Sequence, residues 1–351
     1  MNNGRTGYTT GACAAAAAKA AMLHLLGRET CARVVIPFPD GERRSLPVTW
    51  IRPMGNGIEA AVVKDAGDDP DVTDGAMVSA LVELIQSGDI VFAAGTGVGT
   101  VTKRGLSLPP GEPAINPGPR NMIREALREV TDRPVRVTVS ISGGQELARK
   151  TYNPRLGIEN GLSVLGTSGI VRPFSIDACR CSLALALSVA RAHGVTEPVL
   201  VPGRIGERSA RMILAPVPER IIEVGNEWGF VLGNLGRYGM RRVLLWGHAG
   251  KLVKLIAGHK DTHSSRSGSP VKIVARFACS VLHREMPDVS TTEGILSALD
   301  PFERKKLADS LASAVAQASD TMAGGGLDVS VVLVNMAGDI VGTHGGLNPW
   351  L

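Results

Sequence analysis

The fold is decided by EPVLVPGRIG (residues 197–206), RIIEVGN (220–226) and RVLLWGHAG (242–250), three short apolar segments that each run into a glycine-containing loop. Each loop is followed by a helical pattern, at residues 207–214, up to Tyr238 and at 251–257. Strand–loop–helix units repeated this closely are typical of a parallel sheet with helices on its faces. With a helical pattern over 302–322 and a strand pattern over 328–335, they predict a Rossmann-like, doubly wound α/β domain over residues 173–351.

The chain before residue 173 mixes helical and strand patterns less regularly. A helix is expected over residues 9–26, because alanine has the highest helix propensity, Thr9 and Thr10 are suitable N-caps and Gly27 ends the pattern. Strand patterns lie at residues 33–38, 58–63, 90–94 and 135–142, and helical patterns at 75–87 and 119–130. They predict an N-terminal mixed α+β domain over residues 1–172, so the fold class is α/β and α+β in two domains, as a length of 351 residues suggests.

Composition and charge exclude several classes of protein. The net charge is +5, the basic residues are spread along the chain, and aromatic residues make up only 4%, which disfavours nucleic-acid binding. No uncharged stretch is long enough to span a bilayer, and the five cysteines form no CxxC pair. We therefore expect a reduced, cytoplasmic protein with an acidic small-molecule substrate and no nucleic-acid or membrane partner. A homo-oligomer is left open.

The glycine loops are the predicted binding site for a cofactor. Ligands of an open parallel sheet bind at the carboxyl ends of its strands, where glycine lets backbone N–H groups approach. The residues at these ends are Gly203, Gly206, Gly225, Asn226 and Gly247. None of the loops completes GxGxxG, and residues 247–251 lack the P-loop spacing, so the alternative is that they are ordinary turns.

Histidines and carboxylates are the candidates for proton transfer. His248, His259 and His263 lie close together in sequence, but Gly258 and the residues at 261–262 interrupt any helix that would pair them on a metal. Hydrogen bonding or proton transfer is the better interpretation, and no protein-bound metal is expected. The acidic stretch KDAGDDPD (64–71) fails the EF-hand spacing and is either a solvated turn or a polar wall of an active site.

A second glycine-rich stretch, GTGVGTVTKRG (95–105), follows a predicted strand. Its backbone amides are able to cradle an anion, with Lys103 and Arg104 adding charge. A plain glycine-rich hairpin explains the same pattern, and both interpretations stay open.

Several motifs together resemble the CbiD family, the cobalt-precorrin-5B C(1)-methyltransferases of cobalamin biosynthesis. They are RTGYTTGACA (5–14), KDAGDDPDVTDG (64–75), GL (105–106) with GEPAINP (111–117), GTSGIVRP (166–173) and GHAGKLVK (247–254), which continues through AGH (257–259) to THS (262–264). They occur in family order. Departures from the family pattern at Thr96, Ala249 and residues 264–269 bear on local substrate contacts.

The resemblance implies S-adenosylmethionine as methyl donor and a ring-contracted, cobalt-bearing tetrapyrrole as acceptor, methylated at carbon 1 to give cobalt-precorrin-6A. The cobalt then belongs to the substrate. We expect the acceptor in the N-terminal domain and the donor in the C-terminal domain. The expected catalytic residues are His248, His259, His263 and Asp65, and the expected substrate-binding residues are Arg5, Thr9, Thr10, Lys103, Arg172 and Lys251.

Three other interpretations stay open. In the first, the acceptor is a precorrin without cobalt. In the second, the glycine loops bind the cofactor of a nicotinamide-dependent oxidoreductase. In the third, the chain carries a tetrapyrrole without catalysing a reaction. Within the methyltransferase interpretation, the alternative to a histidine base is that the macrocycle needs no protein base at all.

Overall fold

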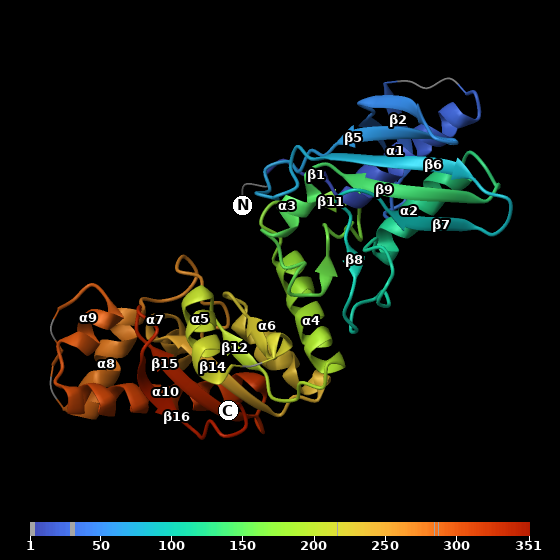
Figure 1. Cartoon of the computed structure of the whole chain (residues 1–351). Helices are drawn as coiled ribbons and strands as arrows, with labels where there is room; N and C mark the ends of the chain where they lie inside the picture. The colour runs from blue at the N-terminus through green and yellow to red at the C-terminus, as the bar shows by residue number, and fades with distance from the viewer. Residues whose placement is uncertain (1–3, 29–31, 216, 284, 287) are drawn as a thin grey trace. The chain divides into compact units, whose positions relative to one another are not determined.

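The computed structural model describes residues 4–28, 32–215, 217–283, 285–286 and 288–351. The chain divides into two compact units, Met1–Asp177 and Ala178–Leu351 (Figure 1). Each unit has its own sheet and its own core. The predicted mixture of helices and sheets in two parts is confirmed.

The main sheet of the first unit has five strands in the order β4-β5-β6-β9-β7. Only the pair of β7 and β9 is parallel, and the other three neighbouring pairs are antiparallel. The strands are β4 (Trp50–Met54), β5 (Gly57–Val63), β6 (Met77–Leu84), β7 (Ile90–Ala94) and β9 (Val135–Ile141).

Helix α1 (Thr10–Leu25) packs against β5, β6 and the helix α2 (Pro117–Arg128), beside the sheet in Figure 1. Almost every residue of α1 from Thr10 to Met22 is buried, and the small alanine side chains allow this close packing on all sides. The Thr9 hydroxyl caps the helix by accepting from the backbone N–H of Ala12 at 3.2 Å, as predicted.

The helix predicted over residues 75–87 is wrong, because this segment forms strand β6. Strand β6 lies between β5 and β9 and is hydrogen-bonded to both. Val78, Ala80 and Val82 are buried at the alternate spacing of a strand. The pairing on both sides overrides the helical spacing of the apolar residues.

Three two-stranded ladders and one short helix complete the first unit. They are β1 (Gly7–Tyr8) with β11 (Ile170–Val171), β2 (Arg33–Pro37) with β3 (Arg43–Pro47), β8 (Thr100–Val101) with β10 (Ile158–Glu159), and α3 (Gly144–Ala148). The first ladder ties the N-terminal segment to the end of the unit.

The sheet of the second unit has five strands in the order β13-β12-β14-β15-β16. The first four are parallel to one another, and β16 is antiparallel to β15. They are β12 (Val199–Val201), β13 (Ile221–Glu223), β14 (Arg242–His248), β15 (Asp328–Val334) and β16 (Ile340–His344). Strand β13, which follows β12 in sequence, lies on one side of it, and β14, which comes next, lies on its other side. The strand order therefore reverses between β12 and β14.

Helices cover both faces of this sheet. Leu244 and Trp246 belong to the core shared with α5 (Arg204–Leu214), whereas Val243 and Leu245 belong to the core on the other face. The remaining helices are α4 (Ile176–Ala192), α6 (Trp228–Asn234), α7 (Ala249–Leu252), α8 (Pro270–Leu282), α9 (Thr292–Ser297) and α10 (Pro301–Ala323), with short 3-10 helices at Pro218–Arg220, Leu235–Tyr238 and Val253–Ala257. None of the helices in the described ranges is both long and apolar enough to cross a membrane.

Candidate functional site

The predicted glycine loops lie together at the carboxyl edge of the second sheet, but the structure requires glycine at these positions for different reasons. A Cβ at Gly206 would lie 2.5 Å from the carbonyl oxygen of Trp246, and one at Gly247 would lie 2.5 Å from the ring of Pro202. These two glycines therefore let α5 and its loop pack closely on β14. Gly203 is different, since a Cβ there would meet only the Glu223 carboxylate, at 3.7 Å. Gly225 has φ +63° and open space around it, as a turn after β13 requires.

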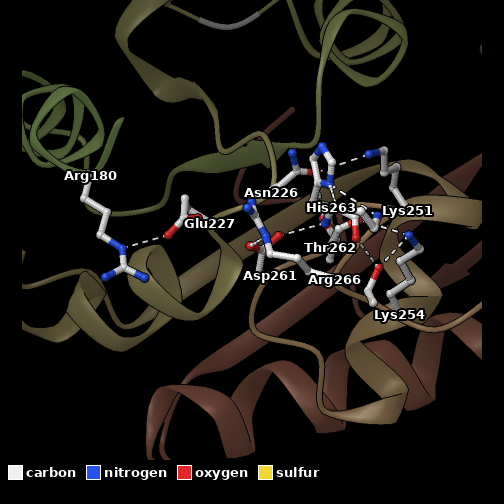
Figure 2. Close-up of polar contacts among 11 residues, drawn as sticks. Arg180, Asn226, Glu227, Lys251, Lys254, Asp261, Thr262, His263 and Arg266 are labelled. Atoms are coloured by element: carbon white, nitrogen blue, oxygen red, sulfur yellow. Dashed lines mark hydrogen bonds and ion pairs between the residues drawn. The ribbon is translucent and has the colours of Figure 1, made fainter. Parts of the chain in front are cut away.

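Asn226 connects the end of β13 to the residues that follow β14. Its Oδ1 accepts from Lys251 Nζ at 3.2 Å and from Thr262 Oγ1 at 3.3 Å, and its carbonyl oxygen accepts from the Thr262 backbone N–H at 3.1 Å. Figure 2 shows Lys251, Thr262 and His263 gathered beside Asn226. Two predicted residues, Asn226 and Lys251, are thereby brought into direct contact.

Lys254 is a buried cation beneath this cluster. Its Nζ donates to the Thr262 carbonyl at 3.0 Å and to Ser267 Oγ at 2.8 Å, and the residue is 4% exposed. Burial and the nearby charge of Lys251 lower the pKa of Lys254. Lys254 thus holds the loop of residues 258–268 in place.

The three predicted histidines have separate partners. His259 Nε2 accepts from the Gly268 backbone N–H at 3.0 Å, and His263 Nδ1 lies 2.8 Å from Ser265 Oγ. His248 Nδ1 accepts from the Gly250 backbone N–H at 3.1 Å and caps α7. Within the described ranges, none of these rings is hydrogen-bonded to another, and no group of His, Cys, Asp and Glu side chains there has the geometry to hold a metal ion.

His248 also lines a cavity of about 420 Å³ at the carboxyl edge of β14 and β15. Its Nε2 lies 3.4 Å from Oε2 of Glu293, which belongs to α9. A neighbouring cavity of about 590 Å³ shares Thr291 and Gly294 with the first. Ligand pockets occupy about 300–1,000 Å³, so this edge has room for a molecule of cofactor size.

In the first unit, Arg5 and Asp65 are brought together as an ion pair. The Arg5 guanidinium and the backbone N–H of Gly67 hold the pKa of Asp65 below its ordinary value. Gly7 pairs with Val171 in the β1–β11 ladder, and Arg172 is the residue that follows this ladder. Arg5 and Asp65 are therefore in direct contact, whereas a contact of Arg172 with them stays a prediction.

Other predicted substrate residues of the first unit have roles within the fold. Thr10 Oγ1 exchanges hydrogen bonds with the backbone of Leu165, and the residue is only 5% exposed. Thr9 caps α1 and packs against Gly166. Lys103 Nζ donates to the carbonyl oxygen of Arg155 at 3.4 Å. Substrate contacts by these three residues stay predictions.

The acidic stretch is a turn held by its own side chains. Lys64, 2% exposed, pairs with Asp71 at 2.7 Å, and Asp74 accepts from the Ala66 backbone N–H at 2.8 Å. Burial opposes ionisation of Asp71, but Lys64 and Thr73 outweigh it and lower the pKa of Asp71. Of the interpretations offered for this stretch, these contacts favour the turn.

The comparisons with known proteins agree with the motifs. A family model described as CbiD matches residues 1–173, and one described as CbiD, C-terminal domain matches residues 261–345. The chain belongs to the CbiD family.

CbiD relatives match nearly the whole chain. A protein of Syntrophotalea carbinolica named cobalt-precorrin-5B C(1)-methyltransferase is 50% identical over 98% of this chain and 98% of its own length. A protein of Methanocaldococcus jannaschii with the same name is 39% identical over 96% of each chain. A crystal structure titled as a cobalamin biosynthesis protein (cbiD) from Archaeoglobus fulgidus is 28% identical, covers 75% of this chain and 83% of that chain, and has a TM-score of 0.40.

Sequence reasoning missed Glu293, Lys254 and Lys64 in this CbiD chain. Lys254 and Lys64 lie in quoted motifs, but nothing in their local pattern indicates that the ammonium groups are buried. Glu293 lies 45 residues beyond His248, in a segment for which no element was predicted. Only the fold brings these two side chains together.

Proposed function

We propose that this chain is an S-adenosylmethionine-dependent methyltransferase that methylates carbon 1 of cobalt-precorrin-5B to give cobalt-precorrin-6A. The observation that carries the proposal is the 50% identity, over 98% of both chains, to a relative named for this reaction. The shared length includes the motifs that form the Asn226 cluster and the Arg5–Asp65 pair.

The proposed donor site is the carboxyl edge of the second unit, which we interpret as a Rossmann-like domain. In open parallel sheets ligands bind where the strand order reverses, and here that point lies between β12 and β14. The open space at Gly203 and the cavity beside His248 both lie at the ends of these strands. This position supports an adenosyl group near Gly203, Gly225, Asn226 and Gly247.

The proposed acceptor site is in the first unit. A corrin precursor carries many carboxylates, and charge-assisted hydrogen bonds from arginine suit them well. Arg5 precedes β1 and Arg172 follows β11, the two strands of one ladder, and Lys103 is a third candidate. Lys251 belongs to the second unit, and its contact with the substrate stays a prediction.

Methyl transfer from a sulfonium is an in-line displacement at carbon. The bond from sulfur to the methyl carbon breaks with its electron pair left on sulfur, and the electron-rich carbon 1 of the acceptor forms the new bond. The protein contributes alignment and exclusion of water rather than a covalent nucleophile. Cys13 is no candidate nucleophile, since burial raises the pKa of its thiol to about 12.

Proton handling is proposed to involve His248, with His259, His263 and Asp65 as reserves. His248 lines the cavity at the strand ends, and proton transfer through it would pass between its Nε2 and Glu293, because its Nδ1 accepts from the Gly250 N–H. The rings of His259 and His263 lie outside this cavity and bond within their own loop. Single-turnover rates at saturating donor and acceptor test the assignment. A loss of less than about threefold in His248→Ala, under about 1 kcal/mol of barrier, removes His248 from any chemical role.

The direct test of the function is turnover by the purified chain. Incubation with S-adenosylmethionine and cobalt-precorrin-5B is expected to add one methyl group to the acceptor, detected by mass spectrometry. Metal-free precorrin in parallel decides which acceptor is used. A protein that binds the macrocycle without turnover is a carrier.

Cofactor preference separates the proposal from an oxidoreductase. S-adenosylhomocysteine is expected to raise the melting temperature, and NADPH is not. The opposite result contradicts the proposal. A cytoplasmic location stays a prediction, and a homo-oligomeric state stays open.

A further inference from the structure

Glu293 lines the cavity beside His248, and its carboxylate is held in a fixed orientation. Oε2 accepts from the Met336 backbone N–H at 3.2 Å and lies 3.4 Å from His248 Nε2. Because His248 Nδ1 accepts from the Gly250 N–H, the proton of the neutral ring is assigned to Nε2, which donates to Glu293. His248 is thus a positioning residue for this carboxylate.

The cavity around Glu293 favours a cation. Its other walls come from threonine, serine, glycine and methionine, and no lysine or arginine is among the described residues that line it. A carboxylate whose basic neighbour in the cavity is a histidine, with no lysine or arginine beside it, attracts positive ligands and repels negative ones. A polycarboxylate acceptor is therefore disfavoured in this cavity.

We propose that the Glu293 carboxylate, oriented by His248, binds the sulfonium and the ammonium of the methyl donor, with the carboxylate of the donor directed away from Glu293. This inference rests on the proposed function and adds a binding residue to it. Methyl transfer converts the sulfonium into a neutral thioether, so the spent donor has one positive charge fewer opposite Glu293. Release of the product is thereby favoured over release of the substrate.

The test compares two ligands that share the adenosine part. Sinefungin carries a protonated amine where the donor has its sulfonium methyl, together with the ammonium and the carboxylate of its amino-acid end. 5′-Methylthioadenosine carries none of these charges. Calorimetric titration of the full-length protein gives both dissociation constants. In Glu293→Gln we expect sinefungin to bind at least about tenfold more weakly and 5′-methylthioadenosine to change by less than about twofold.

A control variant removes one negative charge from the same sheet, far from the cavity. Asp328 begins β15 at the opposite edge of the sheet, where it pairs with Arg242. Asp328→Asn is expected to leave both dissociation constants unchanged. His248→Asn, which removes the donor to Glu293, is expected to weaken sinefungin in the same direction by a smaller factor and serves if Glu293→Gln does not fold.

Three outcomes overturn the assignment. Equal weakening of both ligands in Glu293→Gln means that the change is structural. Unchanged sinefungin affinity means that Glu293 faces no cation. If the wild-type chain binds neither ligand, the proposed function fails first and this assignment with it.

Discussion

The glycines in two motifs of the first unit, at Gly7 and at Gly95–Gly99, are required by close packing, whereas Gly203 and Gly225 at the strand ends of the second unit are not crowded. A Cβ at Gly7 would lie 2.2 Å from the carbonyl carbon of Ala66, and one at Gly97 would lie 2.0 Å from the carbonyl oxygen of Ile141. At Gly203 the nearest atom is 3.7 Å away. A glycine-rich motif therefore indicates a ligand site only where the space beside it is open.

The comparison also bears on the two interpretations of residues 95–105. Gly95, Gly97 and Gly99 each lie within 3.0 Å of backbone or side-chain atoms, measured from the position of a Cβ. Packing alone accounts for these glycines. The contacts therefore favour the structural interpretation of this stretch over an anion cradle.

The largest expected effect comes from Gly97→Ala. The added methyl clashes with the Ile141 carbonyl at a residue with φ +79°, and we expect a loss of more than about 4 kcal/mol of unfolding free energy. Gly75→Ala is the matched control, since it has φ +71° and open space, and it is expected to lose only about 1–2 kcal/mol. Urea denaturation measures both, and equal losses would show that the backbone conformation alone matters.

Lys64→Met is expected to destabilise the protein by about 2–3 kcal/mol, because it leaves the half-buried Asp71 without its partner. The folded-state pKa of Asp71 is lowered, so its contribution is present above the ordinary carboxyl pKa of 3.8 and is lost as the pH falls below it. The variant should therefore lose less stability than the wild type on acidification. The exposed Lys150→Met is the control. Parallel stability–pH curves for Lys64→Met and wild type would contradict the pairing.

Gly203→Val tests whether the uncrowded glycine loop after β12 binds the methyl donor. Gly203 is extended, with φ 162°, so valine fits the backbone while its side chain fills the proposed adenosyl position. We expect an unchanged melting temperature and at least about thirtyfold weaker binding of S-adenosylhomocysteine, or about 2 kcal/mol. Gly206→Ala is the matched variant at a crowded glycine of the same loop. Its added methyl clashes with the Trp246 carbonyl oxygen, and we expect a lower melting temperature. Normal binding by Gly203→Val would exclude a donor at this loop.

The smallest expected effect is that of a single acceptor contact. Arg172→Gln removes one charge-assisted hydrogen bond and should raise the acceptor KM about tenfold, with the donor KM changed by less than about twofold. Arg149→Gln removes an exposed arginine that pairs with Glu146 in the same unit and should change neither constant. Equal effects of Arg172→Gln on both KM values would remove Arg172 from the acceptor site.

Local patterns predicted most of the elements, because strands that end in glycine loops and an alanine-rich segment after threonine N-caps have strong local signals. Strand β6 was mistaken for a helix since Val78, Leu81, Val82 and Ile85 are also spaced as on a helix face. One partner strand, β5, precedes it in the chain, but the other, β9 (Val135–Ile141), comes from distant sequence. Pairing of that kind cannot be read from a local window.

The candidate site was predictable only where a motif contains it. Asn226 and Lys251 follow strand ends and were found, because the topology of a parallel sheet brings strand ends together. The contact between His248 and Glu293 depends on how α9 packs beside β14, and no local pattern encodes that packing. The burial of Lys254 likewise follows from the path of the loop after it.

A crystal structure of the full-length protein with S-adenosylhomocysteine bound is the most direct test of the central claim, that the methyl donor binds at the carboxyl edge of the second sheet. The account predicts the adenosyl group beside the loops that follow β12 and β14, with the amino-acid end of the ligand directed toward Glu293. A ligand found only in the first unit would contradict it.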